Sequence, residues 1–288
     1  MNRIRLLGPL LVIVGIAAAA PKPLYADEWT KTYPISGRAN LRVVTDDGDV
    51  TIVSADQKQI DARVSAEGRK VGPDSEVRIE ESQTGDQVSL FVRLPKLNWN
   101  WWGAGHKSVR IEVRVPRELD LDIRTGDGNV STQAVAGRIR IDTGDGNIAA
   151  TGLKGDVGIH TGDGHVEASG LDGSLDVNTG DGHISVEGRF NVLNLKTGDG
   201  SIEARVKNGS KVESAWRLHS GDGNINLWLP GDLNADIDAR TGDGHITMDV
   251  PVMVSGSLSH SAIHGKLNAG GGSVQIISGD GSIHVQKL

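Results

Sequence analysis

The feature that most constrains this chain is a tetrapeptide that returns at a fixed interval. Thr-Gly-Asp-Gly begins at Thr125, Thr143, Thr161, Thr179 and Thr197, which are equally spaced along the chain. A later copy begins at Thr241, and Ser-Gly-Asp-Gly begins at Ser220 and Ser278. A constant short period is typical of solenoids, in which each repeat contacts only its neighbours.

Aliphatic residues occupy the same positions in successive repeats. One column is Val130, Ile148, Val166, Ile184 and Ile202, the second is Ile139, Val157, Leu175 and Leu193, and the third is Ile141, Ile159, Val177 and Leu195. Apolar and polar residues alternate around these columns, which indicates strands with one buried face. Strands this short can bury that face only by stacking on the next repeat. The sequence therefore predicts an all-β fold, a parallel β-solenoid with about 18 residues per coil.

Each coil needs two turns. The first is the tetrapeptide, and we expect its glycines to have positive φ, where a side chain would be costly. These glycines are Gly126, Gly128, Gly144, Gly146, Gly162, Gly164, Gly180, Gly182, Gly198 and Gly200. The second turn is expected at 134–137, 152–155 and 170–173.

The period loosens towards the C-terminus, where the turns that begin at Thr197, Ser220, Thr241 and Ser278 are unevenly spaced. The last gap, from Thr241 to Ser278, suggests two coils with one degenerate turn between them. Lys207–Glu213 and Pro251–His264 are expected to be bulging loops, and Gly265–Val285 is expected to form the closing coils.

Before Thr125 the pattern changes. Thr45-Asp46-Asp47-Gly48 resembles a first, degenerate turn, and longer strands are expected near 60–66, 88–94 and 109–115. The open end of a solenoid exposes unpaired strand edges, so this part should be a cap. We expect residues 27–124 to be an N-terminal β cap with the first coils and residues 125–288 to be the repetitive solenoid, the two forming one continuous structural unit.

The N-terminus has the layout of a secretory signal, with Arg3 and Arg5 followed by an uncharged apolar stretch. The stretch is shorter than the roughly 20 residues of a membrane-spanning helix. Cleavage is expected after Ala26, giving a signal peptide of residues 1–26, and an uncleaved anchor is the alternative. Export to the periplasm or the cell surface, or secretion, follows, with no transmembrane segment in the mature chain.

Composition excludes several classes. The chain has no cysteine, which excludes disulfides, thiolate metal sites and a lipid-anchoring cysteine. The full chain has a net charge of −7, and loss of three cations and no acid with residues 1–26 leaves −10. An acidic chain is a poor nucleic-acid partner. Phosphate loops, zinc-helix motifs and dinucleotide fingerprints are absent from the sequence, so no cofactor is expected.

The sequence resembles bacterial envelope proteins of the DUF4097 adhesin type. The resemblance spans roughly Leu41 to Val285 and depends on residues 113–116 and 121–130, the repeated turns, and residues 267–272. It implies a periplasmic or surface-exposed β-repeat protein and brings no catalytic residues with it.

Three groups of residues could bind a ligand. The turn carboxylates Asp127, Asp145, Asp163, Asp181 and Asp199 could form a calcium row, although the calcium β-roll places its Asp two residues beyond the last Gly, where this chain has an apolar residue. His165, His183, His160 and His245 could hold a transition metal, although Asn and Ser share that column. We favour turn-forming aspartates and exposed polar residues, and so no metal site.

The third group is Asn98-Trp99-Asn100-Trp101-Trp102-Gly103, half of whose residues are tryptophan. Trp99, Trp101 and Trp102 could stack on sugar rings, or the rings could plug the end of the solenoid, which is the favoured alternative.

Enzymatic function is not expected. The repeated acids are equivalent by symmetry, whereas glycoside hydrolysis needs two carboxylates with different roles. The prediction is a non-catalytic envelope protein, a binding, adhesin-like or structural module that contacts glycan or protein partners. A calcium-dependent adhesin and a polysaccharide lyase or hydrolase on a β-helix are the alternatives.

Overall fold

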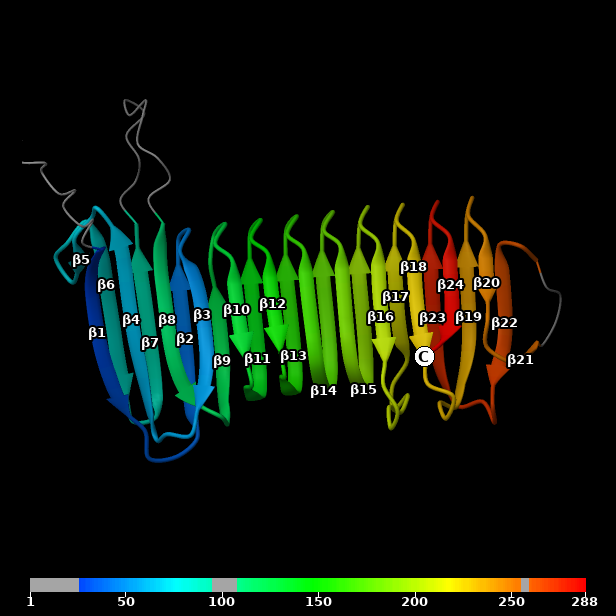
Figure 1. The fold of residues 1–288 in the computed structure, drawn as a ribbon, viewed down its shortest axis with the longest axis horizontal. Coiled ribbons are helices and arrows are strands. Elements are labelled where there is room, and N and C mark those ends of the chain that lie inside the picture. The colour runs from blue at the N-terminus through cyan, green and yellow to red at the C-terminus, as the bar shows by residue number, and fades with distance from the viewer. Residues whose placement is uncertain (1–25, 95–107, 255–258) are drawn as a thin grey trace, which may run out of the picture.

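The computed structural model describes residues 26–94, 108–254 and 259–288, and these residues form an all-β fold. They contain 24 strands and no helix, and hydrogen bonds join all the strands into one sheet. The strands stand side by side in a long row (Figure 1). In the described part of the chain no helix is long and apolar enough to cross a membrane.

The row has two layers, and the chain passes from layer A to layer B at each Thr-Gly-Asp-Gly or Ser-Gly-Asp-Gly turn. Layer A contains, in spatial order, β5 (Val71–Gly72), β6 (Val77–Thr84), β7 (Gln87–Arg93), β2 (Ala39–Thr45), β9 (Leu119–Arg124), β11 (Ala136–Thr143), β13 (Lys154–Thr161), the second halves of β14 (Val166–Thr179) and β15 (Ile184–Thr197), β17 (Trp216–Ser220), β23 (Gly272–Ser278), β19 (Ala235–Thr241), β22 (Ala262–Leu267) and β21 (Val252–Val254). Layer B contains β1 (Ala26–Pro34), β4 (Gln59–Glu67), β8 (Val109–Pro116), β3 (Asp49–Ala55), β10 (Val130–Gln133), β12 (Ile148–Thr151), the first halves of β14 and β15, β16 (Ile202–Val206), β18 (Ile225–Leu229), β24 (Ile283–Lys287) and β20 (Ile246–Met248).

The central strands are parallel, and each is paired with the equivalent strand of the next sequence repeat. Val130 pairs with Ile148, Ile148 with Val166, and Val166 with Ile184. All the members of the three aliphatic columns are buried, with at most 5% of any side chain exposed. The core is therefore a stack of aliphatic rows between the two layers.

The Thr-Gly-Asp-Gly turns form one edge of the molecule, the upper edge in Figure 1. Their threonine hydroxyls are buried and join each turn to the one before it. Thr143 Oγ1 lies 3.1 Å from both Gly126 O and Gly128 O, to which it donates. A hydroxyl is thus required at this position, and Ser220 and Ser278 supply it where threonine is absent.

The prediction of positive φ for the ten turn glycines was wrong. None of them has positive φ, whereas Gly152 and Gly170 of the second turn do. The first-turn glycines are required because backbones approach closely there. A Cβ on Gly144 would lie 2.6 Å from Gly126 O, a distance that real Cβ atoms essentially never show.

The expected order of coils was wrong at the C-terminal end. β23 lies between β17 and β19, and β24 lies between β18 and β20, so the last strands are inserted into the row (red in Figure 1). The turn at Ser278 stacks directly on that at Ser220, since Gly279 N donates to Gly221 O at 2.6 Å. The segment between Thr241 and Ser278 therefore does not add two further coils. Its strands β21 and β22 lie at the end of the row, and β21 falls inside the expected Pro251–His264 loop.

The N-terminal end follows the sequence prediction more closely. The turn that begins at Thr45 stacks under that at Thr125, because Gly126 N donates to Asp46 O. The three longer strands are β4, β7 and β8. At the outer end, Lys31 of β1 in layer B forms an ion pair with Glu81 of β6 in layer A. Charged side chains of this kind discourage further strand pairing.

Candidate functional site

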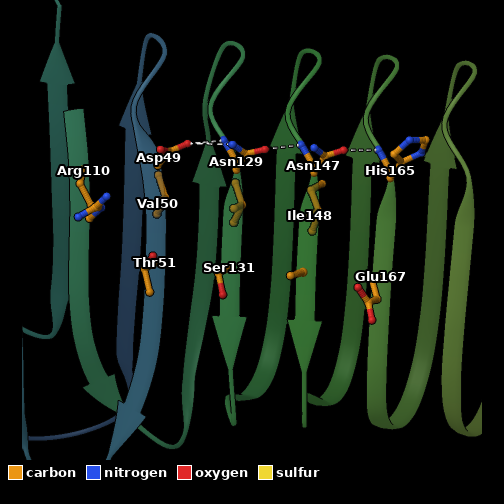
Figure 2. Close-up of a pocket in the computed structure, with 12 residues that line it drawn as sticks. Asp49, Val50, Thr51, Arg110, Asn129, Ser131, Asn147, Ile148, His165 and Glu167 are labelled. Carbon is orange, nitrogen blue, oxygen red and sulfur yellow. Dashed lines mark hydrogen bonds between the residues drawn. The ribbon is translucent and has the colours of Figure 1, made fainter. Parts of the chain in front are cut away.

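The candidate site is a shallow depression of about 500 Å³ on the outer face of layer B, here called face B. It crosses β8, β3, β10, β12 and β14, and Arg110 of β8 lines one end of it (Figure 2). Two rows of outward side chains line it. The row nearer the turns is Asp49, Asn129, Asn147 and His165, and the second row is Thr51, Ser131, Ala149 and Glu167.

The first row is a hydrogen-bond ladder between side chains and backbone. Asn147 N donates to Asn129 Oδ1 at 3.0 Å, and His165 N donates to Asn147 Oδ1 at 2.9 Å. His183 N continues the pattern by donating to His165 Nδ1 at 3.0 Å. Each side chain therefore satisfies the backbone N–H of the next strand, which explains why the position needs an acceptor and not merely a polar residue.

The ladder determines what this row can offer a ligand. Because His165 Nδ1 is an acceptor, the neutral ring has its proton on Nε2. Neither His165 Nε2 nor Asn147 Nδ2 has a hydrogen-bond partner among the described residues. Asn147 and His165 of the first row thus present donors, while Thr51, Ser131 and Glu167 of the second row offer oxygen acceptors.

The opposite outer face, face A, is held together differently. Arg42 Nε and Asp122 Oδ2 are 3.6 Å apart, and Arg124 Nε lies 3.7 Å from Asp142 Oδ2. Asp120 Oδ1 accepts hydrogen bonds from the Arg38 guanidinium at 2.8 Å and from Arg138 N at 3.2 Å. Burial would raise the pKa of Asp120, but these hydrogen bonds and the nearby cations outweigh it and lower the pKa.

A second perturbed carboxylate lies at the edge formed by the second turns. Asp172 forms an ion pair with Arg189, and the hydrogen bond from this guanidinium lowers the pKa of Asp172. The pair joins β14 to β15. The pair lies outside the depression on face B.

The turn aspartates predicted from the sequence, Asp127, Asp145, Asp163, Asp181 and Asp199, are all exposed along the upper edge. Across the described ranges, no three His, Asp or Glu side chains gather closely enough to hold a metal ion.

The histidines do not form one cluster. His165 and His183 are neighbours on face B, whereas His160 belongs to β13 of layer A. His245 lies further along layer B, with its ring centroid 6.2 Å from that of His260. Trp99, Trp101 and Trp102 fall outside the described residues.

The sequence analysis missed Trp228, a half-buried side chain on face B. The Arg205 guanidinium lies over its ring, 4.6 Å from the centroid. The alternation in Ile225-Asn226-Leu227-Trp228-Leu229 could have identified it, since Ile225, Leu227 and Leu229 are buried and Trp228 has the opposite phase.

Comparison with known proteins gives one extended sequence match. The Toastrack DUF4097 family model matches residues 39–286. No curated protein matches the chain.

Several crystal structures are similar to this chain at low identity. A proposed lipid-binding protein from Parabacteroides distasonis is 15% identical, with a TM-score of 0.48, covering 90% of this chain and 96% of the other. A proposed adhesin from the same organism is 11% identical, with a TM-score of 0.47 and coverages of 90% and 97%. A proposed cell adhesion protein from Clostridium sporogenes is 15% identical, with a TM-score of 0.31 and coverages of 92% and 100%.

Proposed function

The chain belongs to the Toastrack DUF4097 family, and we propose that it is a non-catalytic binding module of the bacterial cell envelope whose face B holds a glycan. The observation that supports this most is the ladder along the depression. It leaves donors in one row beside oxygen acceptors in the next. Sugars are rich in hydroxyl groups, which both donate and accept.

The spacing of the ladder suits an extended chain of sugars. Neighbouring strands lie about 4.8 Å apart, so the first row presents a polar side chain at about this interval. A polysaccharide lying across the strands would place successive sugars over successive strands.

The geometry of the depression argues against hydrolysis. Its two carboxylates, Asp49 and Glu167, stand three strands apart, about 14 Å at the usual strand spacing. Glycoside hydrolases place their two carboxyl groups about 5 to 9.5 Å apart. A calcium-dependent role would require the turn aspartates to converge on one ion, and they lie one per repeat along an exposed edge.

The proposed module is a parallel β-solenoid with about 18 residues per coil, capped at residues 27–124 and exported after cleavage behind Ala26. The strand offset, which equals the interval between successive tetrapeptides, supports the coil size, and the Lys31–Glu81 ion pair across the two layers supports a cap. The exported form would begin at Asp27, whose side chain accepts a hydrogen bond from Val71 N at 2.9 Å.

The test is glycan-array and peptidoglycan binding by the chain from Asp27 onward. Ala149→Phe should fill the depression and abolish saturable binding without touching the ladder, because Ala149 is exposed between the two flanking strands. The matched control is His160→Phe, the same new side chain on the opposite face of the same repeat. Equal binding by both variants would contradict the placement on face B, and polysaccharide cleavage by the wild type would contradict a non-catalytic role.

A second variant addresses the tryptophan segment. Replacement of Trp99, Trp101 and Trp102 by Ala separates the two roles proposed from the sequence. Lost binding with an unchanged circular dichroism spectrum would place sugar contacts there. Lost folding would identify the rings as part of the cap.

A further inference from the structure

Gly158 is a glycine that the fold does not require. It lies within β13, it is outside the group of glycines with positive φ, and a Cβ added to it would meet nothing within 4 Å. The turn glycines, by contrast, face a backbone oxygen of the preceding turn. Glycine inside a strand weakens the strand, and it often marks a place where a ligand approaches the backbone closely.

Gly158 forms the floor of a depression of about 310 Å³ on face A. Across the strands its register neighbours are Arg140 on β11 and Asp176 on β14. Both side chains are exposed. The gap between their strands is two strand spacings, roughly 9.6 Å, so the opposite charges face each other over a bare floor.

These two charges differ from the ion-paired charges on face A, and Arg138 and Asp156 line the same depression. Arg42 is paired with Asp122, and Arg124 with Asp122 and Asp142. Within the described ranges Arg140 has no ion pair, and Asp176 has only a hydrogen bond of 3.3 Å from Asn194 Nδ2. A cation and an anion at this separation match a ligand that has both charges at its two ends.

We propose that this depression binds a short zwitterionic peptide, with the peptide carboxylate on Arg140 and its ammonium group on Asp176. The Arg guanidinium can hold a carboxylate through two parallel hydrogen bonds. An extended dipeptide spans about 7 Å, and the side chains of Arg140 and Asp176 reach across the rest of the gap between their strands. A small peptide side chain rests over Gly158. This site goes beyond the proposed glycan function, since it lies on the opposite face and takes a different ligand.

The experiment is an NMR titration of the chain from Asp27 onward with the dipeptide Ala-Ala. N-acetyl-Ala-Ala lacks the ammonium group and Ala-Ala amide lacks the carboxylate. Ala-Ala should bind at least tenfold more tightly than either. Arg140→Gln should remove the preference for the free carboxylate, and Asp176→Asn should remove the preference for the free ammonium. Equal binding of the three dipeptides, or no binding of Ala-Ala, would overturn the proposal.

A substitution of Gly158 separates loss of dipeptide binding from loss of folding. Gly158→Val should raise the melting temperature, because valine suits a strand and its Cβ has free space, and it should abolish dipeptide binding. Ala149→Val on face B is the control and should leave dipeptide binding unchanged. Undiminished binding by Gly158→Val would show that the dipeptide does not lie over β13.

Discussion

Faces A and B belong to the two layers of the same repeat and share its turns, yet they are held together by different interactions. At the centre of the row, ion pairs such as Arg42–Asp122 join neighbouring strands of face A, whereas the uncharged Asn129–Asn147–His165 ladder joins those of face B. The ion pairs of face B, such as Arg63–Glu112 and Lys207–Glu187, lie further along the row. The repeat specifies only the inward positions and the turns, so the outward positions of each face can specialise.

The largest expected effect is a loss of stability at the stacked turns, which the two faces share. Gly146→Ala should destabilise the protein by about 3 kcal/mol, because its Cβ would lie 2.1 Å from Gly128 O and neither backbone can move away alone. The measurement is urea unfolding followed by circular dichroism. Gly158→Ala is the control and should cause no loss. A loss below about 1 kcal/mol for Gly146→Ala would mean that the two faces do not depend on a tightly stacked turn.

The sequence predicted the buried aliphatic columns and the stacked turns well, because both repeat along the chain. Ile148 and Val166 recur at a fixed interval, and a constant interval in parallel strands gives the register directly. The position of β23 and β24 could not be predicted this way. The spacing between turns gives the length of the intervening segment, but it does not say which strands the next turn stacks on. The two serine turns at Ser220 and Ser278, which stack on each other, were the available signal.

The candidate site was predicted less completely than the fold. The column containing Asn147 and His165 was identified as polar and exposed, which is correct. Its requirement for an acceptor depends on where the next backbone N–H points, and periodicity does not contain that information. For the same reason the turn glycines were assigned positive φ, when their constraint is contact with another repeat.

A change within the face B ladder should have an intermediate effect. Asn147→Ala removes the acceptor for His165 N, and loss of such a hydrogen bond should cost about 1 kcal/mol in thermal or urea unfolding. Asn147→Asp keeps the acceptor and should cost less. On face A, Arg124→Ala should cost about 0 to 1 kcal/mol, because exposed ion pairs contribute little.

Salt sharpens this contrast. At 1 M NaCl the effect of Arg124→Ala should shrink, since surface charges are screened over a few ångströms, while that of Asn147→Ala should persist. If both effects shrink alike, then the ladder is electrostatic in origin and the two faces do not differ as described.

The smallest expected effect is the pH dependence that Asp120 of face A contributes. The hydrogen bonds from Arg38 and Arg138 lower the folded-state pKa of Asp120 below its unfolded value of about 3.9. A carboxyl group with a lowered pKa stabilises the fold above its unfolded pKa and loses that contribution as pH falls through the folded value. The stability difference between wild type and Asp120→Asn should therefore be present at pH 6 and should decline progressively below about pH 4. Asparagine keeps an oxygen for Arg138 N, so the variant isolates the charge. The corresponding stability difference for Asn147→Ala should stay constant over this pH range, because an amide does not titrate. A parallel decline in the Asn147→Ala difference would show that acid weakens the whole fold and not face A alone.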